Sequence, residues 1–164
     1  MAIDLTPNGT RGAQISRRLV RAINRCVIAM ARLFRGRAIR IIGQPVLVLT
    51  TIGAISGRRH SVPLVYFPDG ADRWLVIASF GGSARHPAWY VNMAKHPVQV
   101  WVEVNGRTRR VQAESLRGQE RATTWTRITS AAPNYVAYQT KTDREIPVIR
   151  LTPSPNPSSL MSHQ

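Results

Sequence analysis

Two short turn sequences, Asp69-Gly70 and Asn105-Gly106, restrict the fold of this chain more than any other feature. Asp-Gly and Asn-Gly favour the tight, positive-φ turns that join neighbouring antiparallel strands. Apolar runs rich in β-branched residues stand on both sides of each turn. These runs are residues 61–68, 73–79, 97–104 and 107–116. The sequence therefore predicts two β-hairpins.

Two further strands complete the expected sheet. Residues 45–51 form an uninterrupted apolar run, which suggests burial on both faces, and residues 145–152 form the last strand. Pro63 indicates an edge strand or a bulge, because proline cannot donate to a sheet ladder. Helices are expected before the fourth strand and, over 118–131, before the last. We predict an α+β fold with a closed or split antiparallel β-barrel. The absence of βαβ alternation and of a GxGxxG sequence argues against a Rossmann sheet.

The stretch 74–97 joins a strand to a helix through small residues. An apolar run ends at Ser79, Gly81-Gly82 follow, and two His-Pro pairs bracket a segment with helical spacing. Such a corner can hold a phosphate or a flat ring against exposed backbone N–H groups. A β-bulge followed by a helix start is the alternative.

The loop 53–60 is a candidate anion loop. Gly53 and Gly57 allow backbone N–H groups to converge, and Ser56, Arg58 and Arg59 add side-chain donors. A plain hairpin turn with solvated arginines is the alternative.

The N-terminal region divides into a polar stretch, residues 1–10, expected to be a frayed arm, and a basic amphipathic segment. Residues 11–40 hold nine arginines and no acidic residue, with apolar side chains at helical spacing. This helix could dock on the domain with a solvated basic face, or lie on anionic lipid. A nucleic-acid arm is the weakest alternative, since only Phe34 could stack on a base. The expected organisation is a 1–40 arm, a 41–152 barrel and a disordered 153–164 tail.

The composition restricts the possible partners and chemistry. With 23 basic against 8 acidic residues, the net charge of +15 favours an anionic partner. Cys26 is the sole cysteine, and the histidines lack metal-ligand spacing, so we expect no metal. No catalytic triad or carboxylate pair stands out, although Tyr135 and Tyr138 could share a helix face and supply a proton. An enzyme of this composition would depend on a cofactor.

Four stretches together resemble the deazaflavin-dependent nitroreductase family of actinobacteria. They are Leu-Thr-Thr-Ile-Gly-Ala-Ile-Ser-Gly at 49–57, Val-Pro-Leu-Val-Tyr at 62–66, Val-Ile-Ala-Ser-Phe-Gly-Gly-Ser-Ala-Arg-His-Pro-Ala-Trp-Tyr-Val-Asn at 76–92, and Pro-Asn-Tyr-Val-Ala-Tyr-Gln-Thr-Lys-Thr-Asp-Arg-Glu-Ile-Pro-Val at 133–148. The resemblance covers residues 45–152 in order, which makes it more specific than one motif.

The resemblance implies a flavin-reductase-like split barrel that binds coenzyme F420, an 8-hydroxy-5-deazaflavin with a phosphate and an oligoglutamate tail. It implies hydride transfer to a quinone or nitroaromatic acceptor, in a cytoplasmic protein held peripherally at the inner face of the cell membrane through residues 11–40. The implied catalytic residues are Tyr66, Ser79, Tyr135 and Tyr138. The implied coenzyme-binding residues are Gly53, Ser56, Gly57, Arg58, Arg59, Pro63, Ala78, Ser79, Phe80, Gly81, Gly82, Arg85, Pro87, Trp89 and Asn92.

Two positions depart from the family pattern and keep alternatives open. Ile55 and Phe80 stand where the family often has basic residues, and Arg58, Arg59 and Arg85 could replace the lost cations. The first alternative is a non-enzymatic lipid or fatty-acid binder on the same barrel. The second is a flavin mononucleotide (FMN) enzyme on a related barrel.

Overall fold

The computed structural model describes residues 2–34, 40–41 and 43–155. The helical elements are α1 (Arg17–Leu33), the short 3-10 turn η1 (Phe80–Gly82), α2 (Ala88–Lys95), α3 (Gly118–Ala131) and α4 (Asn134–Lys141). The strands are β1 (Arg40–Ile41), β2 (Gln44–Ile52), β3 (Arg59–Val65), β4 (Phe67–Pro68), β5 (Trp74–Ile77), β6 (Val100–Val104), β7 (Arg107–Ser115) and β8 (Val148–Pro153). Of the expected tail, residues 156–164 lie outside the described residues, as do residues 35–39 of the basic arm.

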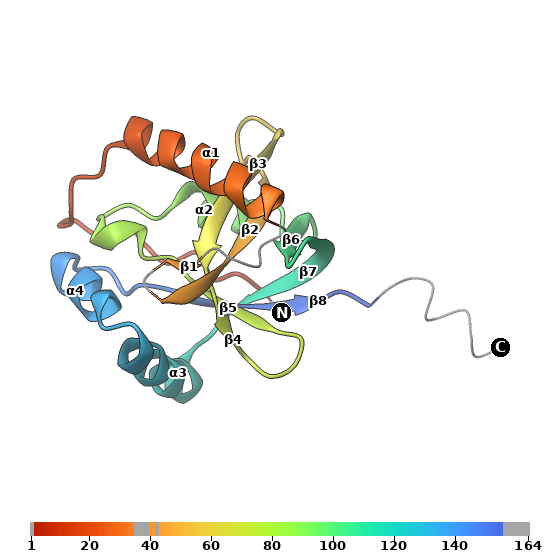
Figure 1. Ribbon diagram of the computed structural model, residues 1–164. Coiled ribbons are helices and arrows are strands. Elements are labelled where there is room, and N and C mark those ends of the chain that lie inside the picture. The colour runs from red at the N-terminus through yellow and green to blue at the C-terminus, as the bar shows by residue number, and fades with distance from the viewer. Residues whose placement is uncertain (1, 35–39, 42, 156–164) are drawn as a thin grey trace.

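The strands form one curled antiparallel sheet in the order β1-β2-β6-β7-β8-β5-β4. Strand β3 lies outside this order and pairs with β2. Figure 1 shows the sheet wrapping around a shared core, with α1 across one side and α3 and α4 together at another. The predicted α+β split barrel is confirmed. Pro63 lies opposite Val48 in β3, whose described ladder is with β2 alone, so the edge-strand prediction also holds.

Both predicted hairpins form. Asn105 and Gly106 have φ values of 51° and 73°, which is the left-handed pair that this turn requires, and Val104 pairs with Arg107. At the other turn, the N–H of Asp69 donates to the carbonyl of Arg73 at 3.0 Å. Local turn chemistry thus sets the register of β4–β5 and β6–β7.

The run 61–68 differs from expectation because it forms two strands. The chain leaves β2 at Val65 and joins β5 at Phe67, so Tyr66 stands at the change of partner. Its N–H donates to the carbonyl of Pro45 at 3.0 Å and closes the ladder there. This change of partner splits the barrel and could not be read from an unbroken apolar run.

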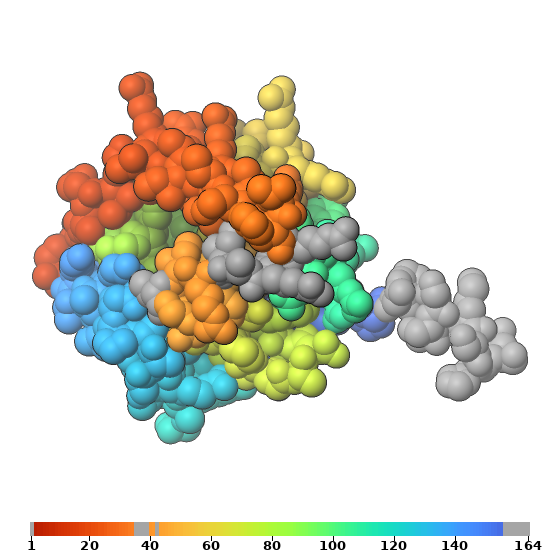
Figure 2. Space-filling view, viewed as in Figure 1, coloured from red at the N-terminus to blue at the C-terminus, as the bar shows by residue number. Residues whose placement is uncertain are grey.

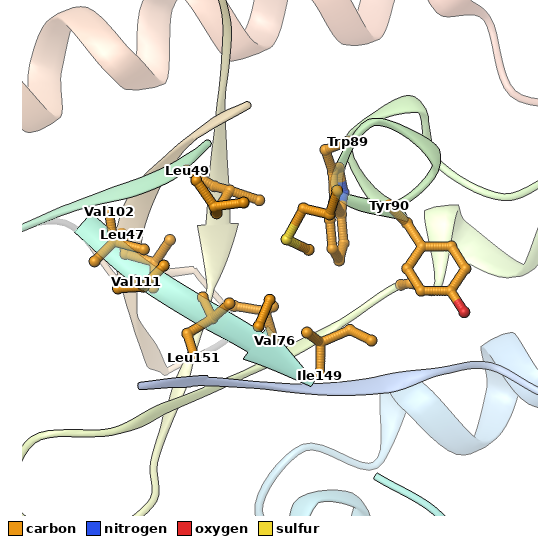
Figure 3. Packing of buried hydrophobic residues seen from close by; sticks show 13 residues of the cluster. Leu47, Leu49, Val76, Trp89, Tyr90, Val102, Val111, Ile149 and Leu151 are labelled. Carbon is orange, nitrogen blue, oxygen red and sulfur yellow. The ribbon is translucent and has the colours of Figure 1, made fainter. Parts of the chain in front are cut away.

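Two clusters of buried side chains form the core. The larger lies inside the barrel and includes Leu47, Leu49, Val76, Val102, Val111, Ile149 and Leu151. Trp89 and Tyr90 of α2 close its open end (Figure 3). The smaller cluster packs α3 and α4 on β5 and β8 through Leu75, Ile77, Ile128, Tyr135, Ile146 and Val148. The larger cluster therefore holds α2 against the barrel, and the smaller one holds α4.

The prediction of a frayed arm at residues 1–10 is wrong. Residues 2–15, here called the strap, run along the body of the protein and are hydrogen-bonded to it. Backbone bonds join Ser115 N–H to Ala2 carbonyl at 3.2 Å and Gly9 N–H to Ala84 carbonyl at 2.8 Å. Hydrogen bonds to Asp143 and His86 hold further residues of the strap. Polar composition did not reveal these partners, because they lie far away in the sequence.

Helix α1 follows the strap and begins at Ser16, whose hydroxyl accepts the N–H of Leu19. One face docks on β2 and β3, with Ala31 buried and Val20 and Val27 half-buried. No described helix has the length and apolar content needed to cross a membrane.

Candidate functional site

The corner at residues 79–82 is left-handed over three consecutive residues. Phe80, Gly81 and Gly82 have φ values of 44°, 61° and 82°. Glycine adopts this conformation freely, whereas Phe80 carries a steric cost of about 1–2 kcal/mol. The N–H of Gly82 donates to the Ser79 carbonyl, and that of Ser83 to the Phe80 carbonyl, both at 3.0 Å. The corner is therefore a rigid, strained turn shortly after the end of β5.

The N–H groups of Ser79 and Phe80 have no acceptor within the described part of the chain. Free donors next to Gly81 and Gly82, which carry no side chains, suit a flat ligand with acceptor atoms at its edge. The sequence predicts that a ring binds at this corner beside Ser79, and that role stays a prediction.

Helix α4 brings the tyrosine pair to the corner. The rings of Tyr135 and Tyr138 are perpendicular, with centroids 5.7 Å apart. The ring of Phe67 packs edge-on against that of Tyr135, with centroids 6.0 Å apart. Burial raises the pKa of Tyr135 well above its usual value, with Tyr138 adding to the effect. Tyr66, half-buried next to Phe67, also has a pKa raised by burial. The phenols of Tyr135 and Tyr66 are thus held in their protonated form at neutral pH.

Figure 2 shows this face of the molecule hollowed between α1 and α4, with the yellow-green of the corner region at its floor. Ile15, the last residue of the strap, reaches over the corner, and a Cβ built on Gly81 would lie 3.1 Å from its Cδ1 atom. The strap therefore forms part of the wall of the hollow. Sequence reasoning missed this role, although Ile15 has the helical spacing of the apolar residues that follow.

The 53–60 loop is closed by its own polar groups. Gly57 N–H donates to the Gly53 carbonyl at 2.9 Å, and Ser56 Oγ lies 2.9 Å from His60 Nε2. Arg58 is exposed, and the guanidinium of Arg59 stacks over Trp101 at 4.7 Å from the ring centroid. The loop thus presents cationic side chains at the end of the β2–β3 hairpin.

Asn92 connects this loop to the helix that follows the corner. Its Oδ1 accepts the Ala54 N–H at 2.9 Å, and its Nδ2 donates to Thr51 Oγ1 at 3.1 Å. Both halves of the buried amide are therefore used to hold the loop. The structure places Asn92 beneath the loop, where it links the two candidate subsites.

The remaining predicted residues differ in exposure. Trp89 is buried in the core, Pro87 begins α2, and Ala78 is fully buried at the end of β5. Pro63 is half-buried in β3, and Arg85 is exposed beside the corner. Gly53, Gly57 and Ser56 shape the cationic loop. The fold thus collects the predicted residues into two neighbouring groups, one at the corner and one at the loop.

One described cavity, of about 250 Å³, contains none of the predicted site residues. Asp4, Tyr90 and Arg121 are among the residues that line it, beneath the strap. The candidate site is an open hollow, not an enclosed pocket. Among residues 2–34, 40–41 and 43–155, no three His, Cys, Asp or Glu side chains are grouped as a metal site.

Sequence reasoning also missed two buried residues at the corner, His86 and Arg144. The backbone N–H of His86 donates to Oδ1 of Asn8 in the strap at 3.0 Å, and the centroid of its ring lies 4.9 Å from that of Tyr90. Arg144 lies 4% exposed behind Ser79. Their only sequence signals were a His-Pro pair and an arginine within the Thr142–Pro147 stretch.

Comparison with known proteins agrees with this geometry. A model of the F420H2-dependent quinone reductase family matches residues 23–153. The F420H2-dependent quinone reductase Rv1261c of Mycobacterium tuberculosis strain H37Rv is 35% identical over 111 residues, which cover 66% of this chain and 73% of the relative. Rv3178 of the same strain, whose name gives the same activity, is 34% identical over 109 residues, covering 66% and 90%.

Solved structures show the same fold. An F420H2-dependent reductase, FDR-A, is 38% identical with a TM-score of 0.58, covering 65% of this chain and 93% of that one. A structure described as a domain-swapped dimer is 32% identical with a TM-score of 0.60, covering 77% and 94%. Because the family model spans most of the chain, and the fold and motif order agree, this chain belongs to the F420H2-dependent quinone reductase family.

Proposed function

We propose that this protein transfers a hydride from reduced coenzyme F420 to a quinone, at the hollow between the 79–82 corner and α4. One observation carries the proposal: in a chain of this family, the Ser79 and Phe80 N–H groups, which have no acceptor among the described residues, lie in a corner that contacts α4, the helix of Tyr135 and Tyr138. The family match favours this activity over the lipid-binding and FMN alternatives.

The residues present suit the coenzyme. The corner lacks side chains at Gly81 and Gly82 and offers two N–H donors for the edge of a flat ring. Arg58 and Arg59 supply cations for a phosphate or for tail carboxylates. They replace the basic residue that the family often has at the position of the fully exposed Ile55. When bound, the reduced coenzyme supplies the hydride, and the quinone takes it up together with one proton.

The protein's own contribution is orientation and proton supply. Tyr138 is half-buried on the rim of the hollow, so its phenol can donate a hydrogen bond to an acceptor oxygen. Tyr135 is 6% exposed, and its edge-on packing holds Tyr138 in place. The strap and Ile15 cover the corner and help to exclude water. A nitro group presents similar oxygen acceptors, so nitroaromatic compounds are alternative substrates.

The activity test uses the whole chain and reduced F420. F420 fluorescence titration gives the affinity, and oxidation of the reduced coenzyme with menadione gives the rate. Arg59→Ala and Ser79→Ala should each weaken coenzyme binding by about tenfold, equal to 1.4 kcal/mol. Arg107→Ala, an exposed arginine of the β6–β7 hairpin, is the matched control. If the wild type shows no binding at tens of micromolar, the proposed function is wrong.

We also propose that α1 rests on an anionic membrane surface, where a quinone would be dissolved. Large apolar side chains form an exposed stripe along α1. The members of this apolar stripe are Leu19, Ile23, Met30, Leu33 and Phe34, each 47–77% exposed. Arg21, Arg25 and Arg32 each lie two positions after a stripe residue, which turns them to the opposite side of the helix. This is the pattern of an interfacial helix.

Sedimentation with lipid vesicles tests the membrane proposal. Binding to phosphatidylcholine vesicles that contain phosphatidylglycerol should fall several-fold in the double variant Leu19→Gln, Ile23→Gln. Val98→Gln is the control, because it removes a similarly exposed apolar side chain, 66% exposed, that does not belong to α1. Equal sedimentation of both variants would refute the role of the stripe.

A further inference from the structure

Arg144 is a buried arginine that binds the corner from behind. Its guanidinium donates four ways: Nε to the Ser83 carbonyl at 2.9 Å, Nη2 to the carbonyls of Ala78 at 3.0 Å and Ser79 at 2.9 Å, and Nη1 to His86 Nδ1 at 3.2 Å. The side chain thus contacts both ends of the left-handed turn. Arg144 lies four residues before β8 begins at Val148, so the barrel restricts its position.

No carboxylate pairs with Arg144 within the described part of the chain. Its acceptors are three backbone carbonyls and a neutral imidazole nitrogen, and burial lowers its pKa. Burial of an arginine without an acidic partner is costly, because carbonyl dipoles only partly replace water. Other arginines here, such as Arg150, lie among carboxylates. The unusual setting of Arg144 therefore indicates a role other than ion pairing.

The geometry of the peptide bond shows what these hydrogen bonds do. In a trans peptide, the carbonyl of one residue and the N–H of the next point in opposite directions. Since the carbonyls of Ala78 and Ser79 both point toward Nη2 of Arg144, the N–H groups of Ser79 and Phe80 point away from it. These are the two N–H groups without an acceptor in the described residues.

We propose that Arg144 is a positioning residue that turns the Ser79 and Phe80 N–H groups toward the ring of the ligand. The two peptide dipoles carry the effect of the buried charge outward, so acceptor atoms or negative charge on the edge of a flat heteroaromatic ring are favoured there. This inference rests on the proposed function, because that function supplies the ring. It assigns the affinity for the ring to Arg144, and the affinity for phosphate to Arg58 and Arg59.

Binding of two ligands separates these contributions. One ligand is F420, and the other is its 8-hydroxy-5-deazaflavin nucleoside, which has the ring but neither phosphate nor tail. Arg144→Lys keeps the charge but loses the planar array of donors, and should weaken both ligands by about the same tenfold factor. Arg59→Ala should weaken F420 alone. Arg121→Lys is the matched control, because Arg121 is also largely buried and donates to the Ile146 carbonyl, away from the corner.

A second measurement does not depend on the stability of the variant. In the wild type, the ¹⁵N–¹H signals of Ser79 and Phe80 should move more than those of Gly57 and Arg58 when the nucleoside is added. Unmoved Ser79 and Phe80 signals under saturation would overturn the inference, as would an Arg144→Lys protein that is folded and binds the nucleoside as the wild type does. Failure of the proposed function is a separate result, in which the wild type binds neither ligand.

Discussion

Gly82 and Tyr138 are in direct backbone contact: a Cβ built on Gly82 would lie 2.6 Å from the carbonyl oxygen of Tyr138 and 2.9 Å from Cβ of Lys141. This contact sets the distance between the corner and α4, and so between the free N–H donors and the tyrosine pair. The geometry of the site therefore depends on the absence of one side chain.

Gly82→Ala should displace α4 and strain the left-handed turn. We expect the free energy of unfolding to fall by about 1–3 kcal/mol, and quinone reduction to fall further than coenzyme affinity, because Tyr138 moves. Gly118→Ala is the control, since Gly118 also has a positive φ of 51° but nothing lies within 4 Å of its Cβ position. Chemical denaturation and steady-state kinetics compare the two. Equal losses in both variants would mean that the contact with α4 is unimportant.

Tyr138→Phe should slow the reduction of menadione by about tenfold or more, because a proton donor at the acceptor is lost. Coenzyme affinity should stay within about twofold, since the ring edge is retained. Tyr135→Phe should have the smaller effect on rate, because this phenol is almost fully buried against Phe67. The reverse order of effects would exchange the roles of the two tyrosines.

Asp143 holds the strap, so Asp143→Asn should loosen it. The carboxylate accepts the N–H groups of Thr10 and Arg11 and the Thr10 hydroxyl at 2.5–3.1 Å, and these bonds lower its pKa to about 2. A lowered carboxyl pKa stabilises the attached strap above the unfolded value near 4 and loses that effect as the pH falls toward 2.

Amide hydrogen exchange of residues 9–13 measures this loosening at neutral pH, where the variant should exchange faster than the wild type. Asp72→Asn, a carboxylate bonded to Arg109 at 3.2 Å on the β4–β5 hairpin, is the control and should leave those amides unchanged. Unchanged exchange in Asp143→Asn would show that the other contacts of the strap suffice.

His86 should also make stability fall toward acid pH, in a higher pH range than Asp143. Burial, and then the charge of Arg144, lower its pKa, against the contribution of the Thr6 and Pro7 carbonyls. Because Nδ1 accepts from Arg144, Nε2 carries the hydrogen and donates to the Thr6 carbonyl at 2.8 Å. The neutral ring is thus the form that binds both the corner and the strap.

The unfolded chain therefore binds this proton more readily than the folded one, and stability should fall as the pH drops below about 6.5. Thermal unfolding between pH 5 and 8 should show this slope in the wild type and a shallower one in His86→Gln. His96→Gln, at the end of α2, should keep the wild-type slope. Identical slopes in all three proteins would contradict the assignment of the neutral form.

The sequence alone determined the elements whose causes are local. Asn105-Gly106 and Asp69-Gly70 specify hairpins because the turn residues themselves adopt the required φ values. The helix predicted over 118–131 has those bounds in the structure. The order of the family stretches identified the barrel, and with it most residues at the corner and the 53–60 loop. Their individual roles in binding and catalysis remain predictions.

Only the tertiary structure decided how distant segments meet. Asp143 lies 133 residues from Thr10, and Arg144 lies 66 residues from the Ala78 carbonyl that it binds. No local sequence pattern predicts such pairs. A backbone carbonyl or N–H is present at nearly every position, and the fold decides which of them a side chain binds. The polar strap was therefore mistaken for a frayed arm, and one apolar run for a single strand. The same selection made Arg144 the support of a corner whose small residues the sequence had already revealed.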